Sequence, residues 1–343
     1  MKKIGEGAFS GCESLSHINI PNSVTEIGEY AFSHCESLTD IFIPRGVTAI
    51  GCDAFHDCKQ LNISVDPENS KFYVEDGILY ERNDDGKNKL LRYPPNKTNP
   101  FFQVSKETVA IEDGAFFGAT NLTDIDIPEG VARIGAEAFN GCDALTSIVI
   151  PNSVTKLEGY PFEFCRSLKH VKLPDGLTTI GARLFRCCSS LADIVIPDSV
   201  TIIQNHAFSE CESLADIKLP KGLQEIWEGA FEECTSLTKI ELPKGITDIR
   251  NKVFCNCTAL ESVIIPDTVT KIGFQAFDGC SSLSAIQLSC MSVPDIDVYE
   301  DSFSGIDTKQ CVLFVPKQIL NDYQQHPVFS QFKNIQEIPS SES

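Results

Sequence analysis

Residues 12–32, CESLSHINIPNSVTEIGEYAF, contain the pattern that decides the fold. In this segment Ile18 and Ile20 alternate with His17 and Asn19, which predicts a short strand with one buried face. Pro21 ends this strand because proline has no N–H to donate to a ladder. Gly28 then allows the backbone to turn, and we expect Ala31 and Phe32 to pack beneath it in a short helical or 3₁₀ turn.

The same pattern returns every 23 residues along most of the chain. It is marked by an apolar residue before a proline and by a phenylalanine three residues before a cysteine or, once, an alanine. The phenylalanines of this register are Phe9, Phe32, Phe55, Phe116, Phe139, Phe162, Phe185, Phe208, Phe231, Phe254 and Phe277. Only stacked coils can bury apolar faces that a single coil leaves exposed, so the period predicts a solenoid of about twelve coils.

The 23-residue pattern, Cys-Glu-Ser-Leu-x-x-Ile-x-Ile-Pro-x-x-Val-Thr-x-Ile-Gly-x-x-Ala-Phe, closely resembles the BspA-like leucine-rich repeats of host-associated bacteria and some protists, over nearly the whole chain. The resemblance implies a right-handed leucine-rich-repeat solenoid with a parallel β-sheet on its concave face. Short strands and helical or 3₁₀ turns are expected on the convex side. Family members look like secreted or cell-surface proteins that attach to host proteins or other cells, which implies a binding or adhesion module at the cell surface.

The repeat is interrupted once. Phe55 and Phe116 are 61 residues apart, where two coils would take 46, so 15 residues are extra. Short β-prone runs around Asp76-Gly77 predict a β-hairpin at about residues 66–103, which projects from the solenoid and rejoins it near Val104. A similar interruption occurs in BspA-like proteins. We expect the hairpin aromatics to pack on each other, with a ligand platform as the alternative; they are Phe72, Tyr73, Tyr80 and Tyr93.

The solenoid is predicted to span residues 1–289, and residues 290–343 to form a C-terminal capping segment, because an open solenoid end exposes core and unpaired strand groups. Within the cap we expect a last strand at 311–316, a helix at 318–325 and apolar cover after it. Cys290 and Cys311 could pair if the protein is exported. At the other end, Ile4 and the glycine after it are already in repeat register, so the chain is expected to begin inside a repeat.

Ten of the 15 cysteines share one repeat position: Cys12, Cys35, Cys58, Cys142, Cys165, Cys188, Cys211, Cys234, Cys257 and Cys280. Stacked side chains in such a column have Cβ atoms about 4.8 Å apart, beyond the usual distance of roughly 3.5–4.5 Å in a disulfide. We therefore predict reduced, buried thiols that act as small apolar side chains. Disulfides or a string of metal ligands are the alternatives.

The composition limits the partners. The formal charge of -20 repels phosphate backbones and anionic lipid heads at long range. No segment approaches the roughly 20 apolar residues that a membrane span needs. We therefore expect neither nucleic acid binding nor direct membrane insertion. The acid excess is expected to keep the protein soluble, with calcium binding on an acidic face as the alternative.

No motif of catalysis or cofactor binding accompanies the repeat. The sequence has no glycine-rich phosphate loop, no H-E-x-x-H and no nucleophile elbow, and its six histidines are scattered. Adjacent cysteines such as Cys187 and Cys188 lack the four converging donors of a structural zinc site. We predict no catalytic residue, no cofactor and no metal site.

The two residues that flank the second apolar position of each L-x-x-I-x-I segment are predicted to face outward on the concave sheet. They vary between coils while the core repeats, which leaves them free for recognition. The predicted ligand-binding residues are Phe42, Asp124, Asp126, Val149, His170, Lys172, Asp193, Val195, Asp216, Lys218, Lys239 and Glu241. Their mixture of apolar and charged side chains is typical of binding faces, although strand propensity and solvation alone would also explain it.

The predicted function is recognition of a protein or another cell-surface macromolecule through this face. The alternative is a self-associating structural scaffold whose sheet edge or end stacks with further copies of the chain. The sequence leaves the oligomeric state and the identity of the ligand open.

Overall fold

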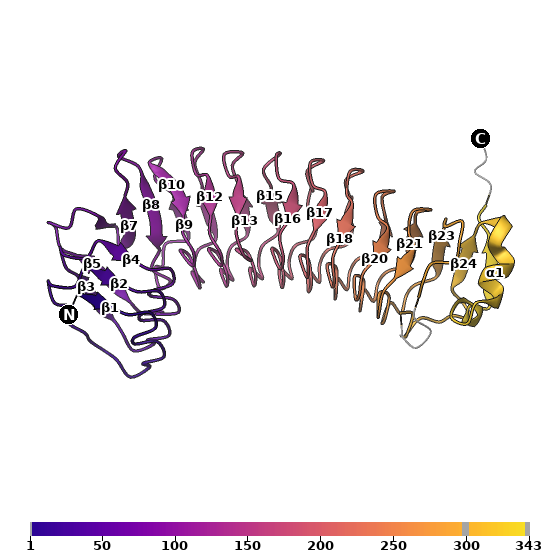
Figure 1. Ribbon diagram of the computed structural model, residues 1–343, viewed down its shortest axis with the longest axis horizontal. Helices are drawn as coiled ribbons and strands as arrows, with labels where there is room; N and C mark the ends of the chain where they lie inside the picture. Colours follow the sequence, from indigo (N-terminus) through magenta and orange to yellow (C-terminus); the bar gives the residue numbers. More distant parts are fainter. Residues whose placement is uncertain (1, 297–301, 340–343) are drawn as a thin grey trace. The chain divides into compact units, whose positions relative to one another are not determined.

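The computed structural model describes residues 2–296 and 302–339 of the 343-residue chain (Figure 1). The chain forms two compact units, Met1–Leu168 and Lys169–Ser343. Each unit is a row of coils. Most coils contribute a first short strand from the L-x-x-I-x-I segment, and a second short strand follows at the Thr-x-Ile segment. The predicted solenoid of stacked parallel strands is confirmed.

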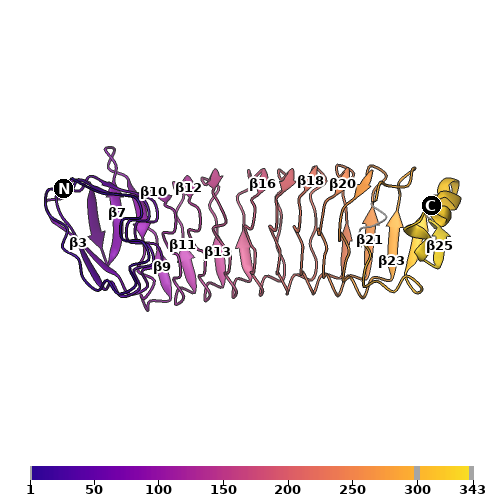
Figure 2. The ribbon, with the colours of Figure 1, turned by 60° about the horizontal axis from the view of Figure 1, so that its bottom comes forward.

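In the first unit, partners in each ladder lie one repeat apart, as in the pairing of Ala110 with Arg133 and of Arg133 with Lys156. The first strands are β3 (Asp40–Ile43), β5 (Asn62–Val65), β9 (Phe101–Gln103), β11 (Asp124–Asp126) and β13 (Ser147–Val149). The second strands are β1 (Lys3–Ile4), β2 (Glu26–Ile27), β4 (Ala49–Ile50), β10 (Thr108–Ile111), β12 (Arg133–Ile134) and β14 (Lys156–Leu157). Figure 2 shows β9, β11 and β13 in one row.

In the second unit, Lys239 pairs with Ser262 and Ser262 with Ala285, again one repeat apart. The first strands are β15 (His170–Lys172), β19 (Lys239–Glu241), β21 (Ser262–Ile265) and β23 (Ala285–Leu288). The second strands are β16 (Thr179–Ile180), β17 (Ile202–Ile203), β18 (Glu225–Ile226), β20 (Asp248–Ile249) and β22 (Lys271–Ile272).

A column of stacked phenylalanines lies in the core of each unit. The ring centroids of Phe116 and Phe139 are 4.9 Å apart in the first unit. Those of Phe208 and Phe231 are 5.5 Å apart in the second, with the rings within 3° of parallel. All four side chains are fully buried. Burial of one such ring contributes about 1.5–3 kcal/mol to stability before the entropy cost of ordering it, so the column fixes how the coils stack.

Gly28 has a different role from the expected one. A Cβ at this position would lie 2.7 Å from the backbone N of Glu6 and 2.7 Å from the carbonyl C of Gly5, both in the preceding coil. The glycine after isoleucine is therefore needed for the close approach of successive coils, rather than for turning the chain. Ala31 and Phe32, for which we expected a helical or 3₁₀ turn, lie in the hydrogen-bonded turns of residues 29–34.

The insertion is an antiparallel meander of three strands, β6 (Phe72–Glu75), β7 (Ile78–Arg82) and β8 (Asn88–Arg92). Strand β8 also pairs in parallel with β10, so the meander extends the sheet of second strands instead of projecting from it. The rings of Tyr73 and Tyr80 stack with their centroids 5.1 Å apart. These two aromatics are therefore occupied within the meander.

Tyr93 belongs to the core of the solenoid rather than to the meander. It precedes Phe116 by one repeat of 23 residues, and the two rings stack with centroids 5.0 Å apart. The side chain is buried, and the backbone N–H donates to the carbonyl of Ala115 at 2.7 Å. The aromatic column thus continues to the end of the insertion, and the 23-residue register alone would have located Tyr93.

Two adjacent coils of the second unit differ from the prediction, because residues 191–197 and 214–220 have no assigned strand in this described part of the chain. They carry Ala192 and Ala215 at a position where four other coils have threonine, namely Thr39, Thr123, Thr146 and Thr238. At that position, the hydroxyl of Thr146 donates to the carbonyl of Thr123 in the preceding coil at 3.1 Å. Alanine lacks this hydroxyl and has a low strand propensity, so the first ladder is weaker here. The ladder of β16, β17 and β18 joins the same coils.

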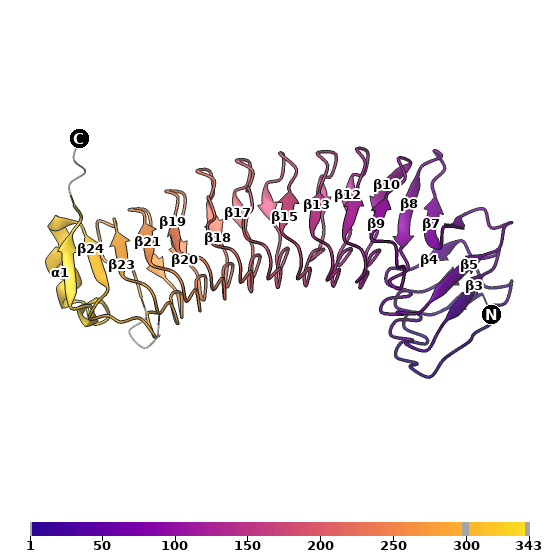
Figure 3. The same ribbon diagram turned by 180° about the vertical axis from the view of Figure 1, so that it is seen from behind.

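The C-terminal segment continues the sheet of first strands with β24 (Val312–Val315), the expected last strand, and then with β25 (Asn334–Glu337), which the sequence did not predict. Between them lie η1 (Lys317–Ile319), α1 (Leu320–Gln325) and η2 (Phe329–Gln331), so the expected helix begins later than predicted. Figure 3 shows α1 at this end. Phe303 stacks on Phe277 at 5.8 Å, and Phe332 packs edge-on against Phe303 at 5.4 Å. Residues 297–301 and 340–343 lie outside the described chain.

Nine cysteines of the column are buried, but Cys12 is exposed, which corrects the prediction for that position. Its coil is the first one described, so no preceding turn covers it. Eight of the buried column thiols donate a hydrogen bond to the phenylalanine carbonyl 26 residues earlier, as from Cys142 Sγ to the carbonyl of Phe116 at 3.2 Å. Burial raises the pKa of Cys142 to about 12. Cys290 and Cys311 are both buried free thiols.

Candidate ligand-binding face

In the first unit, four predicted ligand-binding residues lie on first strands and face away from the core. Phe42 on β3 is 46% exposed, and Val149 on β13 is 55% exposed. Asp124 and Asp126 occupy the exposed positions of β11, on either side of the buried Ile125. The period of two along a strand places these side chains outside whenever the isoleucine column is inside.

Sequence reasoning missed Phe101 and Gln103, which pair with Asp124 and Asp126 in the ladder of β9 and β11. Phe101 is 46% exposed, and Gln103 Nε2 donates to Asp126 Oδ2 at 3.0 Å. Both residues precede their partners by one repeat of 23 residues. The insertion hides this register, but counting back one repeat from β11 would have found them.

The other eight predicted residues lie in the second unit, and all are exposed: His170, Lys172, Asp193, Val195, Asp216, Lys218, Lys239 and Glu241. Four of them belong to the two coils that lack a first strand, so a weakened ladder supports this part of the face. Val195 is 83% exposed, which is unusual for a large apolar side chain. The side chains at the outward positions therefore lie mostly in solvent and bury little surface in the core.

Four of these residues come together on adjacent coils of the second unit. Asp216, Lys218, Lys239 and Glu241 line a groove, in which Lys239 Nζ lies 3.9 Å from Asp216 Oδ2. The groove also includes Lys221 and Lys244, which sequence reasoning did not select because they follow the strand-ending prolines. The recurring Pro-Lys-Gly at 220–222 and 243–245 was the available signal.

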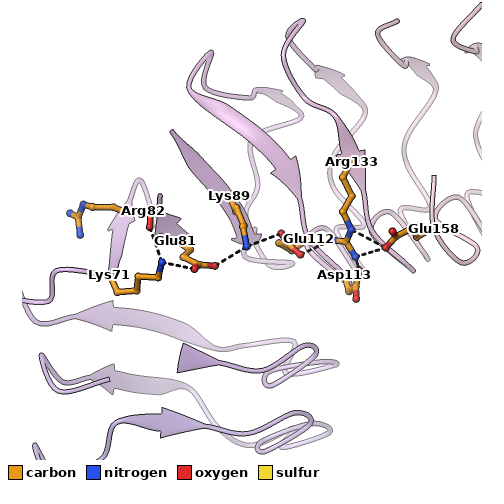
Figure 4. A network of polar contacts seen from close by, with 8 residues as sticks. All are labelled: Lys71, Glu81, Arg82, Lys89, Glu112, Asp113, Arg133 and Glu158. Carbon is orange, nitrogen blue, oxygen red and sulfur yellow. Dashed lines mark hydrogen bonds and ion pairs between the residues drawn. The ribbon is translucent and has the colours of Figure 1, made fainter. Parts of the chain in front are cut away.

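A second polar cluster lies on the sheet of the meander in the first unit (Figure 4). Glu81 of β7 pairs with Lys71 at 3.0 Å and with Lys89 at 3.4 Å. Lys89 also reaches Glu112 at 3.7 Å. Opposite charges therefore alternate from strand to strand across the sheet, and each side chain has its partner within the fold.

Arg133 of β12 continues this cluster. Its guanidinium lies 2.5 Å from Glu112, 2.5 Å from Asp113 and 2.6 Å from Glu158 (Figure 4). Only 23% of the Arg133 side chain is exposed, so solvent screens these contacts less than it would at an open surface. Three carboxylates around one guanidinium stabilise the sheet and leave little positive charge for a ligand.

Beside this cluster, Arg92 of β8 lines a cavity together with Asp53 and His56. The guanidinium of Arg92 is buried and donates from Nη1 to the carbonyl of Phe55 at 2.7 Å and from Nη2 to the carbonyl of Cys58 at 2.6 Å. Burial lowers the pKa of Arg92. Because these donors are used by the turn at 55–58, Arg92 holds that turn against the meander, and its contacts are structural.

Among residues 2–296 and 302–339, no group of three or more His, Cys, Asp or Glu side chains is placed to hold a metal ion. In the same described residues, no helix has the length and apolar character to cross a membrane.

Comparison with known proteins agrees with the repeat pattern. The chain matches the sequence profile of the BspA type leucine rich repeat region in six copies, over residues 1–81, 96–215 and 178–310. No curated protein matches the chain.

Two solved structures are similar. A leucine-rich repeat protein from Eubacterium ventriosum is 28% identical with a TM-score of 0.63, and the match covers 82% of this chain and 69% of that one. A leucine rich cell surface protein from Faecalibacterium prausnitzii is 28% identical with a TM-score of 0.48, and the match covers 76% of this chain and 56% of that one. The profile covers most of the sequence, and the stacked coils follow its repeat, so the chain belongs to the BspA-type leucine-rich repeat family.

Proposed function

We propose that this chain is a non-catalytic binding module of a cell-surface or secreted protein, which takes a macromolecular ligand on the outward side of the first strands within each unit. The observation that carries the proposal is the exposure of large apolar side chains at one repeat position, with Val149 at 55%, Val195 at 83% and Ile264 at 39%. Covering apolar surface releases about 25 cal/mol per Å², so a partner that covers these positions gains free energy.

The frame that carries these side chains favours binding at low entropic cost. The coils are already ordered by the buried phenylalanine columns, so a ligand need not order the backbone of the face. Charged neighbours such as Asp126 and Lys172 add electrostatic selection between partners. In this chain the outward residues differ from coil to coil while the core residues repeat, which supports the same function.

The test is capture of ligands from an extract of host cell surfaces and extracellular matrix by immobilised wild-type chain and by a face variant, Val149→Lys with Val195→Lys and Ile264→Lys. We expect the variant to capture at least about tenfold less material, because three apolar side chains that a ligand would cover become charged. Its melting temperature should change by no more than a few degrees, since these side chains lie outside the core.

The matched control introduces the same three charges beside the second strands, as Thr155→Lys with Gln224→Lys and Thr247→Lys, at residues that are also exposed. This control should capture like the wild type. Equal capture by the face variant and the wild type would reject the face, and loss in both variants would mean that added charge alone prevents capture.

A further inference from the structure

The groove of the second unit runs along residues 216–219 and 239–244. Its apolar part is formed by Leu219 and Leu242, which lie beneath it, and by Ile264, which is 39% exposed. Its charged residues are Asp216, Lys218, Lys221, Lys239, Glu241 and Lys244. In a chain with a formal charge of -20, four lysines against two acids make this groove locally basic.

Most of this positive charge has no partner in the fold. Within residues 169–296 and 302–339, Lys218, Lys221 and Lys244 form no ion pair, and each is exposed. Lys239 lies 3.9 Å from Asp216, but both side chains are about two-thirds exposed, at 67% and 68%. Such a pair contributes little, because solvent screens it and two long side chains must be held in place. The groove therefore presents cationic groups that a ligand can still neutralise.

The basic region is short. Lys221 and Lys244 directly follow the strand-ending prolines of two adjacent coils. The corresponding position is Asp198 in the coil before them and Asp267 in the coil after them, and both acids are exposed. Positive charge is thus confined to a width of about two coils, each about 4.8 Å, and acids border it on both sides.

We propose that this groove binds a short acidic peptide segment whose acidic residues alternate with apolar ones, an inference that rests on the function proposed above. In an extended peptide, residues i and i+2 lie on the same side about 6.6 Å apart, so two carboxylates can reach lysines of adjacent coils. Successive residues of an extended peptide point to opposite sides, so the intervening apolar side chains can lie on Ile264 and the leucine floor. The carboxylates then point away from the floor, towards the ends of the long, exposed lysine side chains at the rim of the groove. The ion pairs between carboxylates and lysines select acidic ligands, and burial of the apolar side chains provides most of the affinity.

The bordering acids distinguish this ligand from long polyanions. A sulfated glycan or a nucleic acid strand that filled the groove would extend beyond it and place its next charges near Asp198 or Asp267, where like charges repel. A glycan also presents hydroxyl groups, which would lose hydrogen bonds to water over the apolar floor. A short acidic peptide with apolar side chains avoids both costs.

The experiment measures fluorescence anisotropy of a short fluorescein-labelled peptide in which Glu and Leu alternate, titrated with the full chain. The groove variant is Lys218→Glu with Lys221→Glu and Lys244→Glu. We expect the Kd to rise at least about tenfold in this variant, since three attractive contacts become repulsive. The matched control, Lys106→Glu with Lys309→Glu and Lys333→Glu, changes the net charge equally at exposed lysines and should change the Kd less than about threefold.

Three further probes test the ligand class. A peptide alternating Glu with Ser and one alternating Lys with Leu should both bind more weakly than the Glu-Leu peptide. A heparin oligosaccharide should compete poorly. The proposal is overturned if the wild type does not bind the Glu-Leu peptide, or if the groove variant binds it equally well. It is also overturned if the Glu-Ser peptide binds as tightly, or if the oligosaccharide binds more tightly than the peptide.

The two proposals fail separately. If the Val149, Val195 and Ile264 variant loses captured ligands while the Glu-Leu peptide does not bind the wild type, only the ligand class is wrong. If that variant captures like the wild type, the binding face itself is wrong. Peptide binding that depends on Lys218, Lys221 and Lys244 would then belong to a local site rather than to the proposed face.

Discussion

The meander sheet and the lysine groove use charge in opposite ways. In the sheet, Arg133 lies within 2.6 Å of three carboxylates, and Glu81 lies between two lysines. In the groove, Lys221 and Lys244 have no ion pair among the described residues of the second unit. The first set of charges is neutralised by the chain itself, and the second set is left to solvent.

This difference teaches where to look for recognition on a repeat protein. Charges that are paired and partly buried hold strands together, and removing one leaves its partners uncompensated. Exposed, unpaired charges contribute almost nothing to stability and remain available to a ligand. The density of charged residues is therefore a poor guide to a site, whereas the lack of an internal partner is a useful one.

The largest effect is expected for Arg92→Met. The buried guanidinium donates to the carbonyls of Phe55 and Cys58, and both carbonyls would lose a charge-assisted hydrogen bond. The free energy of unfolding should fall by about 3–5 kcal/mol, measured by urea unfolding. Lys244→Met is the matched change in the groove and should alter it by less than about 0.5 kcal/mol. Equal losses of stability in Arg92→Met and Lys244→Met would contradict the claim that Arg92 supports the fold and that Lys244 does not.

A smaller effect is expected for Gly135→Ala, next to Arg133. Its Cβ would lie 2.6 Å from the backbone N of Asp113 and 2.8 Å from the carbonyl C of Glu112, so the coils would have to shift. We expect a loss of about 1–3 kcal/mol in the free energy of unfolding. Gly176→Ala is the control, because its Cβ would meet no atom within 4 Å, and its stability should be unchanged or slightly higher. A loss of equal size at Gly176 would contradict the close-approach explanation.

The buried thiols predict a pH dependence. Burial raises the pKa of Cys142 from 9.0 to about 12, so the folded state holds its proton more tightly than the unfolded state. The resulting stability is complete below about pH 9 and is lost as the pH rises towards 12, with about 2.7 kcal/mol lost by about pH 11. Urea unfolding near pH 8 and pH 11 should show a smaller loss for Cys142→Ser than for the wild type. An identical loss would exclude this thiol as the cause.

The smallest effect is expected for Lys221→Gln and Lys244→Gln, singly or together. Both side chains are exposed and unpaired within the described second unit, so each change should alter the free energy of unfolding by less than about 0.5 kcal/mol. Thermal and urea unfolding would measure this. A loss above about 1 kcal/mol would show that these lysines support the fold, and their assignment to recognition would be wrong.

The coils and their core could be predicted because burial repeats with the sequence period. A residue one repeat away from Ile125 or Phe208 packs against the same types of side chain as they do. The burial pattern of one coil therefore predicts the burial pattern of the other coils. Exceptions occur where the neighbours differ. Cys12 is exposed because its turn has no preceding turn among the described residues, and Tyr93 was assigned to the hairpin because the insertion hides its register.

The groove could be predicted only in part. The period of two along a strand identified Lys218 and Lys239, because outward positions follow from buried ones. Lys221 and Lys244 come after the strands, where no periodicity applies, and their approach to the face depends on how the turns fold. Whether a lysine has an ion-pair partner depends on distances between coils, which a single coil's sequence does not contain.

The alanines at 192 and 215 have a mechanical consequence. Coils farther along the second unit are fastened by two ladders, β19 with β21 and β20 with β22. Among the described strands of this unit, the coils of Ala192 and Ala215 share only the ladder of second strands, β16, β17 and β18. On the side of the first strands they have a long hydrogen bond, 3.3 Å from Ala215 N–H to the Ala192 carbonyl, in place of a ladder. A pulling force along the row of coils should therefore separate these two coils first. Lys218 lies in the coil of Ala215. A pulling force on a ligand bound at Lys218 would therefore act directly on the contact between these two coils, so the proposed binding groove lies next to the pair of coils that we expect to separate first.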